Sequence, residues 1–166
     1  MKDAAQLKDM RLYGIFELYD LHTDFFRRAL EGISDEDAHK RLDTQANHIA
    51  WIAGSVVESR FMAARLLGLD IHHGAEDFFK DFQGLQDGVI YPSLAQYLAD
   101  WDRVSPALRA KTLEVDTAWL DERKNMGGWE ASNLEMINFS MYREANMIGQ
   151  IALWRRLLGY PAMSYM

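Results

Sequence analysis

Apolar residues recur every three or four positions along most of this chain, which is the spacing of one face of an α-helix. The pattern predicts long helices over residues 4–31, 45–68, 93–113 and 132–159. Alternation with a period of two, which is typical of a half-buried strand, is absent. The sequence therefore predicts an all-α protein built as a four-helix bundle, with short extra helices in the connections.

Residues that favour helix ends support these limits. Ser132 and Glu135 have the spacing of a capping box at the start of the last helix. Ser93 and Gln96 have the same spacing at the start of the third. Thr44 is the predicted N-cap of the second helix. Pro106 interrupts the third, so either the helix kinks there or a new turn begins.

The connections are less regular than the helices. Ser34 is predicted to begin a short helical turn, and a second short helix is expected around residues 75–82. The connection 69–91 is long for a helical bundle, and connections of this length often carry functional loops. It contains the adjacent pair His72 and His73, which we expect to be solvated because sequence neighbours rarely bind one metal ion together.

Composition narrows the classes of function. A length of 166 residues predicts one domain over residues 1–166. The net charge of −7 disfavours nucleic-acid binding, which normally needs a basic surface. No uncharged apolar run approaches the roughly 18 residues of a membrane span, and no signal peptide is recognised. We therefore expect a cytoplasmic protein with neither a membrane nor a nucleic-acid partner.

The last helix carries the most informative residue. It is apolar on more than one face, which predicts burial on several sides, yet Arg143 lies in its middle. A buried arginine needs a carboxylate or a bound anion. An internal salt bridge, an arginine that reaches the rim, and an anion pocket all satisfy this requirement. The candidate internal partners are Glu58, Glu17 and Asp20.

Other candidate chemistry is sparse. The chain has no cysteine, no HExxH or HxxxH spacing and no GxSxG motif. His48 lies near the start of the second helix, where it is either a structural, hydrogen-bonded residue or part of a pocket. Ser55 follows seven residues later on the same helix face. No catalytic residue is assigned from these patterns.

Two segments resemble the DinB/YfiT-like superfamily: NHIAWIAGSVVESR at 47–60 and REANMIGQIALWRRLLG at 143–159. This resemblance implies a four-helix bundle that commonly dimerises. Many members bind Zn²⁺ or Ni²⁺ through three histidines, and some are thiol-dependent transferases. The positions that correspond to those histidines are Ser55, Arg143 and Met147 here, so the resemblance implies a degenerate metal site.

Two hypotheses follow. The first is a metal-free protein with no cofactor, which binds a small anionic ligand between the second and fourth long helices. Its candidate pocket residues are His48, Ser55, Glu58, Arg143 and Met147. The alternative is a metal- or arginine-assisted transferase or hydrolase, which would hold Zn²⁺ or Ni²⁺ in an altered site. A third possibility is a site that is packed shut, with Arg143 paired to Glu58 or to an acid of the first long helix and association as the function. In every case the resemblance implies a homodimer, and whether the protein is an enzyme stays open.

Overall fold

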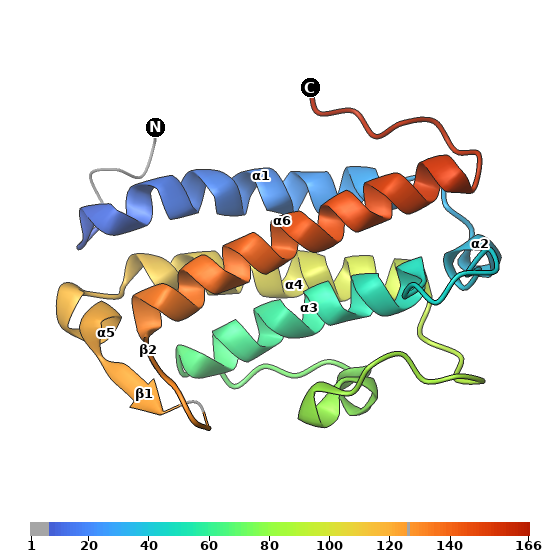
Figure 1. Ribbon diagram of the computed structural model, residues 1–166. Helices are drawn as coiled ribbons and strands as arrows, with labels where there is room; N and C mark the ends of the chain where they lie inside the picture. The colour runs from blue at the N-terminus through green and yellow to red at the C-terminus, as the bar shows by residue number, and fades with distance from the viewer. Residues whose placement is uncertain (1–6, 126) are drawn as a thin grey trace.

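The computed structural model describes residues 7–125 and 127–166, and most of them are helical. Four long helices lie side by side (Figure 1): α1 (Tyr13–Leu30), α3 (Ile49–Leu66), α4 (Leu94–Leu113) and α6 (Asn133–Leu157). The connections contain η1 (Met10–Leu12), α2 (Asp35–Ala38), η2 (Glu76–Phe78), η3 (Lys80–Phe82), α5 (Thr117–Asp121), and the strands β1 (Arg123–Asn125) and β2 (Glu130–Ser132).

Each long helix packs against two others. α3 contacts α4 and α6, while α1 contacts α6 and α4, so the apolar faces of all four helices meet in one core. Aromatic rings fill much of this core, with Phe26, Phe61, Tyr97 and Trp101 all fully buried. The helical periodicity of the sequence therefore identifies the elements that build the protein.

Gly54 sets the distance between α3 and its neighbours. A Cβ at this position would lie 2.6 Å from Cζ of Tyr97 and even closer to the Tyr97 hydroxyl and the Phe79 ring. Both aromatic side chains therefore lie directly on the backbone of α3, where no larger residue fits.

The predicted helix caps are confirmed at two of the long helices. The Ser132 hydroxyl accepts from the Glu135 amide, and the Glu135 side chain accepts from the Ser132 amide, which completes the capping box of α6. The Ser93 hydroxyl caps α4 by accepting from the Gln96 amide. α4 continues as one helix through Pro106, so no new helix begins there.

The predicted start of α3 at Thr44 is wrong. The Thr44 hydroxyl donates to the Arg41 carbonyl at 2.7 Å and so closes a turn. Leu42 and Asp43 before it have positive φ angles of 48° and 56°, which a helix does not allow. The helix begins four residues later, with the His48 imidazole as its N-cap.

The hairpin of β1 and β2 was not predicted. The strands are antiparallel, with Lys124 opposite Ala131. Each has only three residues, which is too short for alternation of apolar and polar positions to be recognised. The hairpin connects α5 to the start of α6 (Figure 1).

The expectation that α6 is buried on several sides is wrong for one face. Four large side chains remain more than half exposed along it: Phe139, Tyr142, Leu153 and Leu157. Their spacing of three, eleven and four residues keeps them near one line of the helix surface. In the part of the chain that the structure describes, no helix has the length and apolar character that crossing a membrane requires.

Candidate functional site

The charge at the centre of α6 is Glu144 and not Arg143. Glu144 is 2% exposed and meets Arg60 of α3, which is 1% exposed. The two side chains form a bidentate pair, with Arg60 Nε to Glu144 Oε1 at 2.8 Å and Nη2 to Oε2 at 2.9 Å. His22 of α1 completes the group, with Nδ1 3.3 Å from Glu144 Oε2. The predicted interior charge was therefore assigned one residue too early.

Almost every donor of the Arg60 guanidinium has a partner. Nη1 donates to the hydroxyls of Thr23 and Ser105, each at 2.7 Å. The guanidinium carbon lies 3.5 Å from the centre of the Trp101 ring and 3.9 Å from that of Tyr19. A buried ion pair whose donors and acceptors are hydrogen-bonded to protein groups has none left to bind a ligand. This group is structural.

Arg143 has a different environment. It is half-buried, and its Nη2 donates to the Ser55 hydroxyl at 2.6 Å. Nη1 contacts the Ser59 hydroxyl and, at 3.4 Å, the Ser55 carbonyl. Within the described chain, no carboxylate forms an ion pair with it, so of the three alternatives the internal salt bridge to Glu58, Glu17 or Asp20 is not the one found. Burial lowers the pKa of Arg143, and the charges of Glu144 and Glu58 only partly oppose this shift.

Arg143 lines a cavity of about 720 Å³. Most of the cavity's lining residues come from the first halves of α1 and α6, from the second halves of α3 and α4, and from α5. These parts of the helices lie at the end of the molecule that carries α5 (Figure 1). Buried apolar side chains make its inner wall: Ile15, Phe16, Tyr19, Leu108 and Met141. Exposed apolar side chains surround its mouth: Met62, Leu66, Phe82 and Phe139. A volume of this size lies within the range of about 300 to 1,000 Å³ that small-molecule sites occupy.

A second arginine in the cavity wall is already neutralised. Arg109 forms a bidentate pair with Asp20, with distances of 2.7 Å from Nε to Oδ1 and 2.8 Å from Nη2 to Oδ2. Arg65 also lines the cavity and is paired with Glu58 and Glu76. Of these three arginines, Arg143 is the one for which no ion pair with a described carboxylate is found.

His48 lies outside this cavity. Its Nδ1 accepts from the Trp51 amide at 3.2 Å, and its ring contacts those of Tyr91 and His39. Burial, followed by the charge of His39, lowers the pKa of His48 to about 4. The side chain is therefore a neutral helix cap at neutral pH, which corresponds to the structural alternative.

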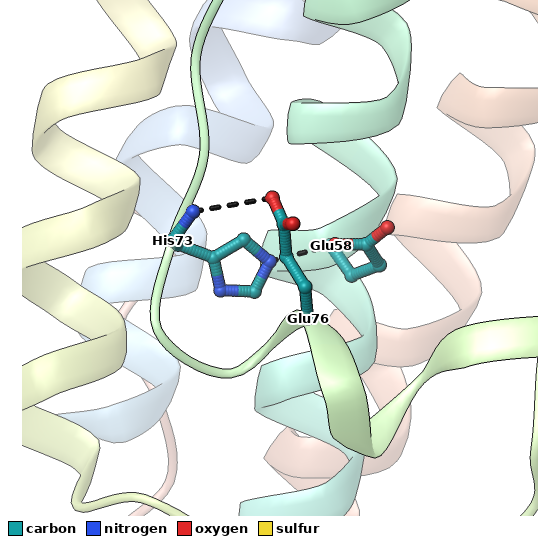
Figure 2. Close-up of side chains that lie close together, drawn as sticks. All are labelled: Glu58, His73 and Glu76. Carbon is teal, nitrogen blue, oxygen red and sulfur yellow. Dashed lines mark hydrogen bonds and ion pairs between the residues drawn. The ribbon is translucent and has the colours of Figure 1, made fainter.

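Glu58 faces the long connection between α3 and α4 instead of Arg143. Its Oε2 lies 2.6 Å from Nε2 of His73, whose side chain is fully buried. Glu76 lies beside them at the start of η2 and accepts from the His73 amide at 3.2 Å (Figure 2). The expectation that His73 is solvated is wrong, because the connection folds back onto α3. His72 does point outward, with a side chain that is 62% exposed.

The five predicted pocket residues thus separate into distinct surroundings. Ser55 and Arg143 contact each other beside the cavity, Glu58 belongs to the cluster with His73, and His48 caps α3. Met147 is partly buried against the apolar core. The set Ser55, Arg143 and Met147 does not suit a divalent cation, because the guanidinium occupies the Ser55 hydroxyl and repels positive charge.

The sequence did contain one signal for the cluster that was missed. Arg65 and Glu58 are seven residues apart on α3 and so share a face of the helix. This spacing predicts that the segment covering that face meets both a guanidinium and a carboxylate. Which loop residue meets them depends on the path of the connection.

No protein-family model matches the chain, and no curated protein sequence matches it.

Proposed function

We propose that the protein binds small amphipathic anions, with the negatively charged group on Arg143 and the apolar body in the cavity. One observation carries this proposal: a half-buried guanidinium without a carboxylate partner in the described chain lines a cavity whose other walls are mostly apolar. Such a cavity supplies both the affinity for an apolar body and one fixed point for a charge.

The energetics favour an anion at this point. Two serine hydroxyls and a carbonyl satisfy some donors of Arg143, but they leave its positive charge without neutralisation. A carboxylate forms charge-assisted, bidentate hydrogen bonds with a guanidinium, and these are stronger than bonds to neutral acceptors. A bound carboxylate therefore offsets the desolvation that the position imposes on Arg143.

Decanoate and decanol provide the test, because they share an apolar chain and differ in charge. Calorimetric titration is expected to show that Arg143→Met weakens decanoate binding about 10- to 100-fold, the loss of a charge-assisted contact. Decanol binding should stay unchanged. Arg109→Met is the matched control and should alter both ligands equally, because Asp20 already neutralises Arg109.

Equal affinities of the unmodified protein for decanoate and decanol would contradict the proposal. So would an Arg143→Met variant that binds decanoate as the unmodified protein does. The measurement separates anion recognition at Arg143 from unspecific uptake of apolar molecules by the cavity.

The remaining parts of the proposal concern family and assembly. We propose a four-helix bundle of the DinB/YfiT-like kind, cytoplasmic, in which Arg143 takes the place of a metal ion. The four long helices and the exposed apolar line on α6 support a bundle that dimerises. Light scattering that gives the mass of one chain would contradict the homodimer.

Ligand binding is favoured over the transferase alternative by the surroundings of the guanidinium. A group-transfer site needs a nucleophile with a base beside it. The hydroxyls of Ser55 and Ser59 contact Arg143, and the Ser59 hydroxyl donates to the Ser55 carbonyl at 2.9 Å. Among the residues that the structure describes, no histidine or carboxylate is hydrogen-bonded to either hydroxyl.

A further inference from the structure

We propose that Glu58, His73 and Glu76 form a binding site for Zn²⁺, in which the cation takes the place of the Arg65 guanidinium. These residues are distinct from Ser55, Arg143 and Met147, and the site does not depend on the ligand proposed for the cavity. It would tie the connection between α3 and α4 to α3.

The three side chains offer converging donor atoms. One ligand atom from each lies within 4.8 Å of the others (Figure 2). In a tetrahedral zinc site with bonds of about 2.0 to 2.2 Å, neighbouring ligand atoms are roughly 3.3 Å apart. His73 Nε2 and Glu58 Oε2 are 2.6 Å apart in the structure, so a bound zinc ion would require these two atoms to move apart by roughly 0.7 Å.

The histidine makes this more than a cluster of acids. The side chain of His73 is fully buried and directs Nε2 toward both carboxylates. At 2.6 Å, the Nε2–H group donates to the Glu58 carboxylate, and among the described residues none pairs with Nδ1. A cation therefore binds when Nε2 loses this proton, to solvent or to Nδ1, because the lone pair of Nε2 is then available, the form in which histidine binds metals.

Arg65 shows where positive charge is already stabilised. Its Nη2 lies 2.8 Å from Glu58 Oε1 and its Nη1 lies 2.7 Å from Glu76 Oε1. The guanidinium thus bridges the two carboxylates that would bind the metal. Its side chain is 29% exposed, so it can turn toward solvent or the cavity when a cation enters.

The donor set selects the class of metal. One imidazole nitrogen and two carboxylate oxygens suit a borderline divalent ion such as Zn²⁺, and three protein ligands leave a position for water. Glu58 comes from α3 and the other two residues from the connection that follows it, so the bound ion would hold this connection against the helix, with Glu58 and His73 15 residues apart in the sequence. Binding is therefore expected to stabilise the folded chain.

The test is Zn²⁺ binding by the full chain, measured by metal analysis after dialysis and by competition with a chromogenic chelator. We expect one Zn²⁺ per chain. His73→Ala and Glu76→Gln should each weaken binding by about 10- to 100-fold or more. Arg65→Met should strengthen it by roughly three- to tenfold, because the competing cation is removed.

Asp77→Asn is the matched control. It removes a carboxylate next to Glu76 in the same segment, but its side chain is 81% exposed and pairs with Lys80, so affinity should change less than about twofold. Helix content by circular dichroism establishes that each variant is folded. Glu76 is half-buried, so Glu76→Gln provides a test even where loss of His73 disturbs the loop.

A second measurement uses thermal unfolding. At one Zn²⁺ concentration, the unfolding midpoint should rise equally for the unmodified protein and Asp77→Asn, and rise less for Glu76→Gln. The proposal is overturned if the chain retains no Zn²⁺, if Glu76→Gln and His73→Ala bind it as tightly as the unmodified protein, or if Arg65→Met weakens binding. Each of these results would make the cluster a purely structural set of ion pairs.

Discussion

Replacement of Glu144 by glutamine should destabilise the protein strongly. Glu144 and Arg60 are 2% and 1% exposed, so the substitution leaves a guanidinium buried without its counter-charge. The new amide group also places N–H donors against the donors of Arg60. Removal of one partner from a buried pair typically costs about 3 to 5 kcal/mol. Typical domains have a total stability of about 5 to 15 kcal/mol, so this is a large fraction.

Urea and thermal unfolding followed by circular dichroism measure this cost. For a domain of about 150 to 250 residues, 1 kcal/mol corresponds to roughly 2 to 4 °C, so the midpoint should fall by roughly 6 to 20 °C. The double variant Glu144→Gln with Arg60→Met removes the unpaired charge. It should recover part of the loss, because apolar replacements of whole buried pairs are often tolerated.

Acid titration gives an independent check on the same pair. Burial alone would raise the pKa of Glu144, but the charge and hydrogen bonds of Arg60, together with His22, lower it below its ordinary value. A carboxylate with a lowered pKa in the folded state stabilises the protein above its unfolded pKa of about 4.3. This contribution is lost as the pH falls below that value, and Glu144→Gln should lack it.

Two results would refute this reasoning. The first is a Glu144→Gln variant within about 1 kcal/mol of the unmodified protein, which would mean that water or movement compensates Arg60. The second is a double variant whose loss equals the sum of the two single losses, because residues in direct contact should show coupling.

Two further predictions concern α3. His48→Asn keeps a residue that caps helices but does not titrate. Because the pKa of His48 is lowered to about 4, only the unfolded state gains this proton between pH 6.5 and about 4, so the protein loses stability as the pH is lowered through that window. Urea unfolding at several pH values should show a smaller loss of stability in the variant. An equal loss in both proteins would contradict the role of His48 as a neutral cap. Gly54→Ala should lower the free energy of unfolding by about 1 to 3 kcal/mol in the same assay, because the added methyl group meets Phe79 and Tyr97. Gly14→Ala is the control, because a methyl group there meets nothing within 4 Å. Equal stabilities of the two variants would contradict the packing argument.

The helices could be predicted because their signals are local. The capping box of Ser132 and Glu135 and the cap at Ser93 involve residues three positions apart, and both are confirmed. The start of α3 was wrong for the same reason: Thr44 is a common cap residue, but it closes a turn with Arg41. The cap that is used, His48, lies four residues later, and its choice depends on the path of the preceding chain.

The surroundings of the charged residues depend on contacts between helices, which periodicity does not contain. Arg143 and Glu144 are neighbours, and about 100° of rotation separates them on α6. Because of that rotation, Glu144 faces Arg60 in the core and Arg143 faces Ser55 beside the cavity. Likewise, the burial of His73 follows from a loop that returns to α3, and no local pattern at His73 indicates this.

The close contact at Gly54 and the part of α3 that lines the cavity, from Ser59 to Leu66, are successive stretches of the helix. At the level of Gly54, the side chains of Tyr97 and Phe79 lie against the helix backbone, and change there is costly. At the level of the cavity, Met62 and Phe139 border open space. Substitutions of the exposed side chains at the mouth of the cavity should therefore affect folding less than a substitution at Gly54. This separation would let ligand specificity diverge among descendants of the protein while the packed end keeps the fold constant.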